Sequence, residues 1–443
     1  MTSSPGVPER SEGEEPSRPS SDPPPATAGT QPWPRLRVPA IYGFLLGIAA
    51  LTAVFVVARG QAGFFEDEDA GTVIQDFASH LVFSRCVWRG ARTEGQEASA
   101  YSGEAHLEIM SEWMERDVTF ALPFGYSPTM LWLLLPLTLL SVPLAYVLWT
   151  AAGAFAAVRM VSSSRFHWVV ALMVLISPIA AGALALGQTA LLGTVGIFFL
   201  AHRTLAPAPS DVARHWRHGF ALAAVLWTLG AKPPLALTAG AAMLALGAIG
   251  PVATAVGLTL AGAAVLTPWM GSGWVVDYAH LIGTYDRVAA DPAFAWSLVP
   301  EHMSNLRAFL SVDLGVRDDL ASRSSNLVWI LSLGLVTLAG WRRRIDPPRV
   351  WALAILSYLL FCSHVSSTDE LLLVVVPALV LPWGSEPRGG LDYLPWIAVP
   401  VGLLLSPALG PAAGVRPSLL WFVELGMAVW IVLTVLRRRE AST

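Results

Sequence analysis

Long apolar runs separated by short polar segments occupy most of this 443-residue chain. A helix that crosses the hydrocarbon core of a bilayer needs about 20 predominantly apolar residues. Leu, Ala and Val dominate the runs, and they do not alternate with polar residues as the strands of an outer-membrane barrel do. We therefore expect an all-α integral membrane protein with about twelve membrane segments. The predicted segments are 40–58, 129–158, 167–184, 189–203, 220–231, 233–249, 252–268, 326–341, 349–362, 371–383, 392–408 and 418–436.

Prolines interrupt several of these runs. The run Met130–Leu140 is too short to cross a membrane alone, and Pro143 follows it. Pro178 and the pair Pro233-Pro234 break two further runs. Broken helices at membrane depth are tolerated where they line a cavity that is enclosed by protein or filled with water. The pattern therefore predicts a cavity among the helices.

Charge is segregated between the two sides of the predicted bundle. Cytoplasmic loops of membrane proteins carry an excess of Lys and Arg, so the arginine-rich side is predicted to be cytoplasmic. Both termini then lie in the cytoplasm, and two long loops, 59–127 and 269–325, face outward. The arginines on the cytoplasmic side are Arg35, Arg37, Arg159, Arg165, Arg203, Arg214, Arg217, Arg342, Arg343, Arg344, Arg349, Arg388, Arg437, Arg438 and Arg439.

Residues 1–39 differ from the rest of the chain, because they are rich in Pro, Ser, Glu and Gly. Such a segment buries too little apolar surface to fold, so we predict a disordered cytoplasmic tail before a transmembrane domain at 40–439. Charged residues make up 14% of the chain, against about a quarter in soluble proteins. The net charge of −4 gives no support for a nucleic-acid partner, which needs a clustered basic face, and none is predicted.

Asp76 lies early in the first outer loop, directly before Phe77. Residues Ile74–Val82 are predicted to form an amphipathic stretch along the outer interface, which puts Asp76 near the mouth of the cavity. A carboxylate there can take a proton from an attacking hydroxyl within hydrogen-bonding reach. Asp is also a good N-cap, so a purely structural role in capping this helix is the alternative.

Lys232 is the only lysine among the 28 lysine and arginine residues of the chain. A single Lys in a sequence that otherwise uses Arg indicates a need for a compact ammonium rather than a planar guanidinium. Lys binds phosphate as a point charge, and a lipid headgroup is the phosphate available at the membrane. The alternative is a lysine that anchors a helix end by extending its ammonium to the interface.

Four further polar residues are candidates for contacts with a substrate. Gln188 could bind a sugar hydroxyl, although a hydrogen bond between helices is the more usual role of such a residue. His302 and Arg307 lie among aromatic residues of the second outer loop, which suit either an interfacial belt or a phosphosugar. Asp369 is predicted as a second acid at the rim of the cavity.

The sequence contains neither a ligand cluster at zinc spacing nor a glycine loop for nucleotide phosphates. We therefore predict no metal and no other cofactor. An enzyme with this sequence would take its donor from the membrane.

An ordered set of short motifs across most of residues 70–385 resembles glycosyltransferase family 87. These are polyprenol-phosphate-mannose-dependent α-mannosyltransferases of the GT-C superfamily. The motifs that carry the resemblance are Asp76-Phe77, Gly90, Tyr101, Pro123-Phe124-Gly125-Tyr126-Ser127-Pro128, Leu135-Pro136-Leu137, Ser177-Pro178, Gly187-Gln188, Ala231-Lys232-Pro233, His302-Met303-Ser304, and Asp369 before Leu371.

The resemblance implies a GT-C-like bundle in a bacterial plasma membrane. It implies an inverting transfer of a sugar, with mannose expected, from a polyprenyl phosphate to a hydroxyl of a lipid, glycan or protein acceptor. The expected site residues are Asp76 as the general base, Lys232 and Arg307 at the donor phosphate, and Tyr126, Gln188, His302 and Asp369 at the substrate. The same scaffold acting on a different sugar, and a lipid or solute transporter, are the alternatives.

Overall fold

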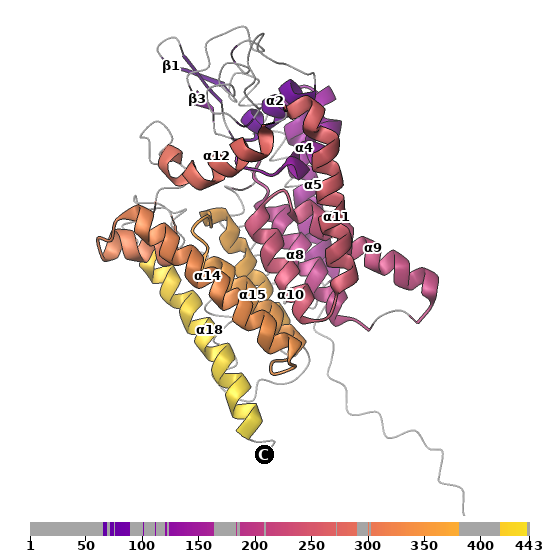
Figure 1. Ribbon diagram of the computed structural model, residues 1–443, viewed down its shortest axis with the longest axis vertical. Helices are drawn as coiled ribbons and strands as arrows, with labels where there is room; N and C mark the ends of the chain where they lie inside the picture. Colours follow the sequence, from indigo (N-terminus) through magenta and orange to yellow (C-terminus); the bar gives the residue numbers. More distant parts are fainter. Residues whose placement is uncertain are drawn as a thin grey trace, which may run out of the picture. The chain divides into compact units, whose positions relative to one another are not determined.

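The computed structural model describes residues 65–68, 71–74, 76–88, 101, 111, 120–121, 124–163, 183, 187–207, 210–271, 273–289, 300, 303–380 and 417–440 (Figure 1). All of these residues belong to one compact unit, Leu36–Thr443. The predicted tail 1–39 and the predicted membrane segments 40–58 and 392–408 lie outside the described residues, as does 167–184 apart from Ala183. The described part of the chain is mostly helical, which confirms the predicted helical class.

Among the described residues, three helices are long and apolar enough to cross a membrane: α5 (Val142–Ser163), α11 (Ile249–Met270) and α14 (Asp318–Trp341). Only 11% of the apolar window of α11 and 22% of that of α14 are buried within the protein. These two helices therefore present apolar side chains outward, as a helix in contact with lipid does. The helices indicate membrane association, and the larger number of crossings stays a prediction.

The predicted segment 129–158 consists of two helical pieces. α4 (Pro128–Leu134) continues as the 3-10 helix η2 (Leu135–Leu139), and α5 begins afterwards with Pro143 in its first turn. Proline has no backbone N–H and is tolerated in the first turn, where that group has no partner in the helix. The interruption predicted before Pro143 is therefore confirmed.

The next helices are α8 (Ala190–Leu205), α9 (Val212–Leu229) and α10 (Pro233–Ala245), which contact one another. α9 also packs against α11, and α11 packs against α4. α9 begins well before the predicted residue 220, because the side chain of Asp211 accepts a hydrogen bond from the Ala213 N–H at 3.0 Å and caps the helix. Its exposed first turns contain the charged Arg214, so hydropathy alone did not reveal them.

α15 (Pro347–Phe361) contacts α10, α14, α16 (Val375–Val380) and α18 (Pro417–Glu440). Its side chains from Val350 to Leu360 are almost all buried, as expected of a helix surrounded by others. The 3-10 helix η6 (Ser367–Val374) precedes α16, so the predicted segment 371–383 begins earlier than expected.

The described part of the segment 269–325, predicted as an outer loop, contains α12 (Trp274–Ala289), the short α13 (Leu306–Ala308) and the π-helix η5 (Phe309–Asp313). Asn305 fixes this segment to the end of α15. Its amide nitrogen donates to the carbonyl of Cys362 at 2.9 Å, and its amide oxygen accepts from the Ala308 N–H at 3.1 Å.

The segment 59–127, predicted as an outer loop, contains a small sheet that was not expected from the sequence. β1 (Phe65–Glu68) pairs antiparallel with β2 (Gly71–Ile74), and β2 pairs in parallel with β3 (Phe120–Ala121). The first two strands are two residues apart in sequence, which is the separation of a tight hairpin. β2 also contains the β-branched run Thr72-Val73-Ile74, which favours an extended backbone.

α2 (Asp76–Trp88) follows this hairpin and differs from the predicted amphipathic stretch at the interface. Its side chains from Phe77 to Val87 are buried, except for that of His80, which is partly exposed. The helix contacts η2, α4, α5 and α11. The prediction of an amphipathic stretch with an exposed polar face is therefore wrong, because both the apolar and the small polar side chains of α2 pack inside the protein.

The buried apolar side chains form two clusters. The first is built mainly on α8, α10, α14, α15, η6, α16 and α18, and the second on α2, α4, α5 and parts of α11 and α12. Ala231 belongs to the second cluster and Leu235 to the first. Lys232 therefore lies at the boundary between the two clusters.

Candidate active site

The turn between α9 and α10 holds Lys232 in place. Ser127, the N-cap of α4, donates from its backbone N–H to the carbonyl of Ala231 at 3.0 Å and from its hydroxyl to the carbonyl of Gly230 at 2.5 Å. Lys232 is the N-cap of α10, and Pro233 follows in the first turn. The predicted helix break at Lys232-Pro233-Pro234 is confirmed, since α9 ends at Leu229 and α10 begins at Pro233. The two hydrogen bonds from Ser127 hold the backbone of the turn between these helices.

Lys232 forms an ion pair with Asp369, which lies 137 residues further along the chain. The Nζ atom lies 2.6 Å from Oδ1 and 2.5 Å from Oδ2 of the carboxylate. The side chain of Lys232 is 21% exposed and that of Asp369 is 2% exposed. The Lys232 side chain is therefore partly accessible to water, and the Asp369 side chain scarcely is.

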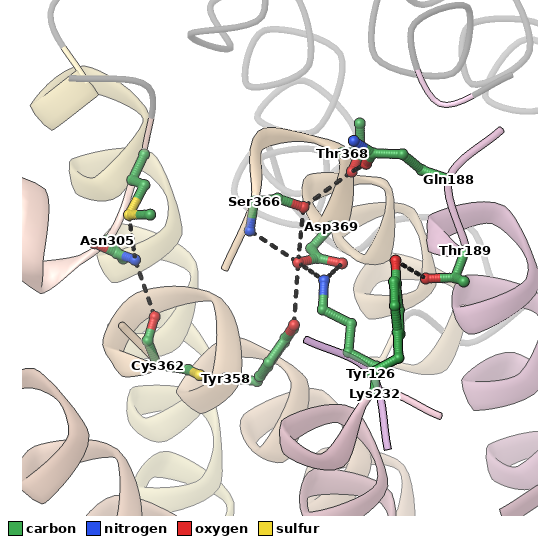
Figure 2. A network of polar contacts seen from close by, with 11 residues as sticks. Tyr126, Gln188, Thr189, Lys232, Asn305, Tyr358, Cys362, Ser366, Thr368 and Asp369 are labelled. Atoms are coloured by element: carbon green, nitrogen blue, oxygen red, sulfur yellow. Dashed lines mark hydrogen bonds and ion pairs between the residues drawn. The ribbon is translucent and has the colours of Figure 1, made fainter. Parts of the chain in front are cut away.

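Asp369 also accepts hydrogen bonds from three protein donors. The Tyr358 hydroxyl donates at 3.1 Å, the Ser366 N–H at 2.9 Å and the Ser366 hydroxyl at 3.1 Å. Figure 2 shows the carboxylate at the centre of these contacts, with Ser366 on one side and Lys232 and Tyr358 on the other. The buried, multiply bonded position of Asp369 differs from the predicted acid at an open rim.

Further hydroxyl and amide groups lie next to this pair. The Thr368 hydroxyl donates to Gln188 Oε1 at 2.5 Å, and the hydroxyls of Tyr126 and Thr189 are 3.3 Å apart (Figure 2). Gln188, Thr189 and Tyr126 are all partly exposed. The structure thus brings together four of the predicted residues: Lys232, Asp369, Gln188 and Tyr126.

The N-terminal end of α2 reaches the same neighbourhood. Phe77 packs against Gly187, the residue before Gln188, and also contacts Trp149 at a ring-centroid distance of 6.1 Å. Trp149 donates from its indole nitrogen to the carbonyl of Gly187 at 2.8 Å. Asp76 is the first residue of α2, and its side chain lies outside the described part of the chain.

Gly187 is a position where a larger residue should be poorly tolerated. Its φ of +64° is in the left-handed region, and a Cβ added there would lie 2.7 Å from Cβ of Phe77. We expect Gly187→Ala to lower the free energy of unfolding by about 2–3 kcal/mol, from backbone strain and overpacking together. Unfolding of the purified protein measures this loss. Gly257→Ala is the matched control, because a Cβ at Gly257 meets nothing within 4 Å; equal stability of the two variants would contradict the expectation.

Aromatic rings surround Tyr126. His80 lies edge-to-face with it at 4.8 Å, and the hydroxyl of Tyr101 donates to its backbone carbonyl at 3.2 Å. Burial raises the pKa of Tyr101 well above its usual value, and the neighbouring Tyr278 raises it further. The Tyr101 phenol therefore stays protonated and acts as a donor, which fixes the backbone at Tyr126.

The guanidinium of Arg307 contacts Asp318 and Ser363 rather than the residues around Lys232. Its Nε and Nη2 atoms lie 2.8 Å and 2.6 Å from the two carboxylate oxygens of Asp318, and its side chain is 1% exposed. Its Nη1 atom donates to the carbonyl of Ser363 at 3.4 Å. This geometry links α13 to α14 and the end of α15, and it gives no support to the predicted role at a donor phosphate. His302 lies outside the described residues.

Three residues of this network were missed in the sequence: Tyr358 and Ser366, which bind Asp369, and Thr368, which binds Gln188. One of them carried a readable signal, because Ser366 stands three residues before Asp369 in a capping box. In that motif the Ser side chain and the residue at the third helical position bond to each other's backbone N–H. The Tyr358 contact had no local signal, since it joins two different helical elements.

A second pair of buried carboxylates, Glu370 and Glu424, lies outside this network. Glu370 accepts a hydrogen bond from the Ser304 hydroxyl at 2.5 Å and is close enough to Glu424 to repel it. Glu424 is fully buried in α18, and neither of its oxygens has a hydrogen-bond partner within the described part of the chain.

We expect Glu424→Gln to raise the free energy of unfolding by about 1–2 kcal/mol, because the amide removes a buried acidic group to which no described residue donates a hydrogen bond. Thermal unfolding in detergent measures the change. Asp319→Asn, at a 45% exposed carboxylate, is the control and should have little effect. A loss of stability in the Glu424 variant would contradict the expectation.

The described residues include no group of three or more His, Cys, Asp or Glu side chains that could hold a metal ion. Comparisons of the chain with protein-family models, with curated proteins and with solved structures found no match.

Proposed function

We propose that this protein is a membrane glycosyltransferase. It transfers a sugar, with mannose as the first candidate, from a polyprenyl-phosphate donor to an acceptor hydroxyl on a lipid, glycan or protein. The observation that carries the proposal is the partly exposed Lys232 side chain, whose ammonium is held by Asp369 beside Gln188, Thr189 and Tyr126. A cation and neighbouring hydroxyl and amide groups suit a sugar that is linked to a phosphate.

The ammonium of Lys232, and not the backbone, would bind the phosphate. Helix N-termini often bind anions through free N–H groups. In α10 the first two residues are prolines, which have no N–H. The next two N–H groups, those of Leu235 and Ala236, both donate to the carbonyl of Lys232. The side chain is therefore the strong donor that this helix end can offer.

The proposed reaction is a single displacement at the anomeric carbon. The acceptor oxygen forms a bond to that carbon, the bond from the carbon to the phosphate oxygen breaks, and the polyprenyl phosphate leaves with the bonding electrons. Lys232 stabilises the charge on the departing phosphate. Asp76 takes the proton of the acceptor hydroxyl, from the face of the sugar opposite the phosphate, so the configuration inverts. Arg307 is left out of this scheme because Asp318 binds its guanidinium.

The proposed setting is a bacterial plasma membrane that the chain crosses about twelve times with both termini in the cytoplasm. The outer loops 59–127 and 269–325 then lie on the same side as the donor headgroup. This topology follows from the distribution of arginine along the chain.

Membranes that contain the protein should transfer a labelled sugar from one member of a panel of polyprenyl-phosphate sugars to an endogenous acceptor. Membranes without the protein are the control. Movement of the intact labelled lipid across the bilayer, with no transferred sugar for any donor, would overturn the proposal in favour of a lipid transporter.

A further inference from the structure

The first turns of α9 expose large apolar side chains. Val212, Trp216 and Phe220 are 71%, 74% and 62% exposed. They follow one another at intervals of four residues, and a helix turns by about 100° per residue, so they lie within about 80° of one another around the helix. The second half of α9 instead contributes buried side chains to the first cluster. The exposed apolar stripe is therefore confined to the end of α9 that is remote from Lys232.

Positive charge lies beside and opposite this stripe on the same turns. Arg217 and Arg214 are placed about 100° and 160° around the helix from Trp216, and both are exposed. The acidic residue nearest in sequence is Asp211, whose carboxylate lies 3.6 Å from Arg214. Both members of this pair are more than half exposed, so it binds weakly and leaves the arginine available to a stronger anionic partner.

Arg203, in the last turn of α8, adds to this positive charge. It is exposed, and it lies close enough to α9 to act on His218. Burial lowers the pKa of His218, and the neighbouring Arg203 and His215 lower it further. His218 is therefore mostly uncharged at neutral pH, and the lasting positive charge of this surface comes from its arginines.

A helix with an apolar stripe, a basic opposite face and an aromatic ring in the stripe has the character of a helix that lies in the headgroup region of a membrane. Trp is enriched at that level because its ring is amphipathic. α9 also packs against α11, whose apolar side chains largely face outward as those of a helix in contact with lipid do. The stripe thus belongs to a helix that adjoins a lipid-facing surface.

We infer that Val212–Phe220, together with Arg203, forms a docking surface for anionic phospholipids. The apolar stripe inserts at the boundary between headgroups and acyl chains, and Arg203, Arg214 and Arg217 bind phosphate oxygens of the headgroups. Each Arg near an anionic membrane surface favours binding about fivefold. This surface lies on the side of the protein that the arginine distribution assigns to the cytoplasm, and it is separate from the site at Lys232.

The test is photo-crosslinking of the full-length protein in nanodiscs that contain phosphatidylcholine and phosphatidylglycerol in equal amounts. A diazirine reagent is attached to the thiol of a Val212→Cys variant, and mass spectrometry identifies the lipids that it captures. Both native cysteines, Cys86 and Cys362, are buried, so the wild-type protein gives the background. Residue 212 should capture phosphatidylglycerol about fivefold more often than phosphatidylcholine. Leu331→Cys, at a 58% exposed position in the middle of α14, is the control and should capture the two lipids about equally.

Arg214→Gln with Arg217→Gln, added to the Val212→Cys protein, should reduce the preference to about twofold or less. Arg317→Gln with Arg323→Gln removes the same charge from other exposed positions and should leave the preference unchanged.

Equal capture of the two lipids at residue 212 would overturn the inference, even if the arginine variants fail to fold. Crosslinks from residue 212 to a second copy of the chain, or no lipid adducts there while residue 331 gives them, would also overturn it. None of these measurements depends on sugar transfer, so their outcome leaves the proposed function untouched.

Discussion

Replacing Lys232 with methionine should lower the free energy of unfolding by about 3 kcal/mol or more and abolish binding of a prenyl phosphodiester. The variant leaves the carboxylate of Asp369 buried, at 2% exposure, without its cation. Removing one partner of a buried ion pair destabilises strongly because the remaining charge is poorly solvated. Unfolding of the purified protein and binding of the prenyl ester measure the two effects.

The double variant Lys232→Met with Asp369→Asn should recover at least half of the lost stability, because no unpaired charge is left, and should still fail to bind the ester. A matched control is available at the surface, where Arg214 and Asp211 are 78% and 56% exposed. Arg214→Met should change the stability by less than about 0.5 kcal/mol. Equal losses of unfolding free energy in the Lys232→Met and Arg214→Met variants would show that the buried ion pair stabilises the protein no more than the exposed one.

Replacing Asp76 with asparagine should lower the rate of sugar transfer by about 10²–10⁴-fold, the range expected for loss of a general base. Asn has nearly the shape of Asp and a similar helix propensity, so the variant should fold and its affinity for the donor should stay close to that of the wild type. Transfer from a labelled polyprenyl-phosphate sugar gives the rate, and thermal unfolding gives the stability.

Asp76→Ala is the companion variant, because alanine provides neither a base nor a negative charge in the first turn of α2. If Asp76 only stabilises this helix start, the alanine variant loses about 0.3–1 kcal/mol of stability and the asparagine variant keeps normal transfer. Normal transfer by folded Asp76→Asn protein would remove this residue from the mechanism.

The helices were predictable from the sequence because their signals are local. The apolar runs 189–203, 252–268 and 418–436 correspond to α8, α11 and α18 with small shifts at the ends. Helix ends are the least certain feature of such predictions, since caps and first turns are often polar. The breaks before Pro143 and Pro233 follow from the missing proline N–H, which acts on the backbone regardless of tertiary packing.

The candidate site was only partly predictable, because its contacts join distant parts of the chain. Lys232 was singled out as the lone lysine, but nothing local indicated that Asp369 would be its partner. Arg307 was predicted to bind phosphate from its charge and its loop, and only tertiary structure reveals that Asp318 occupies its guanidinium. The burial of α2 was also missed, because its short polar side chains were interpreted as a face exposed to water.

The single lysine of the chain makes Lys232 directly accessible to chemical footprinting. An amine-reactive acylating reagent can modify the N-terminal amine and only this one side chain. The side chain is 21% exposed and its ammonium is bound by Asp369, so the rate of acylation should depend on what else occupies that nitrogen. Mass spectrometry of one peptide from intact membranes would then report occupancy of the site, before any acceptor or product is known.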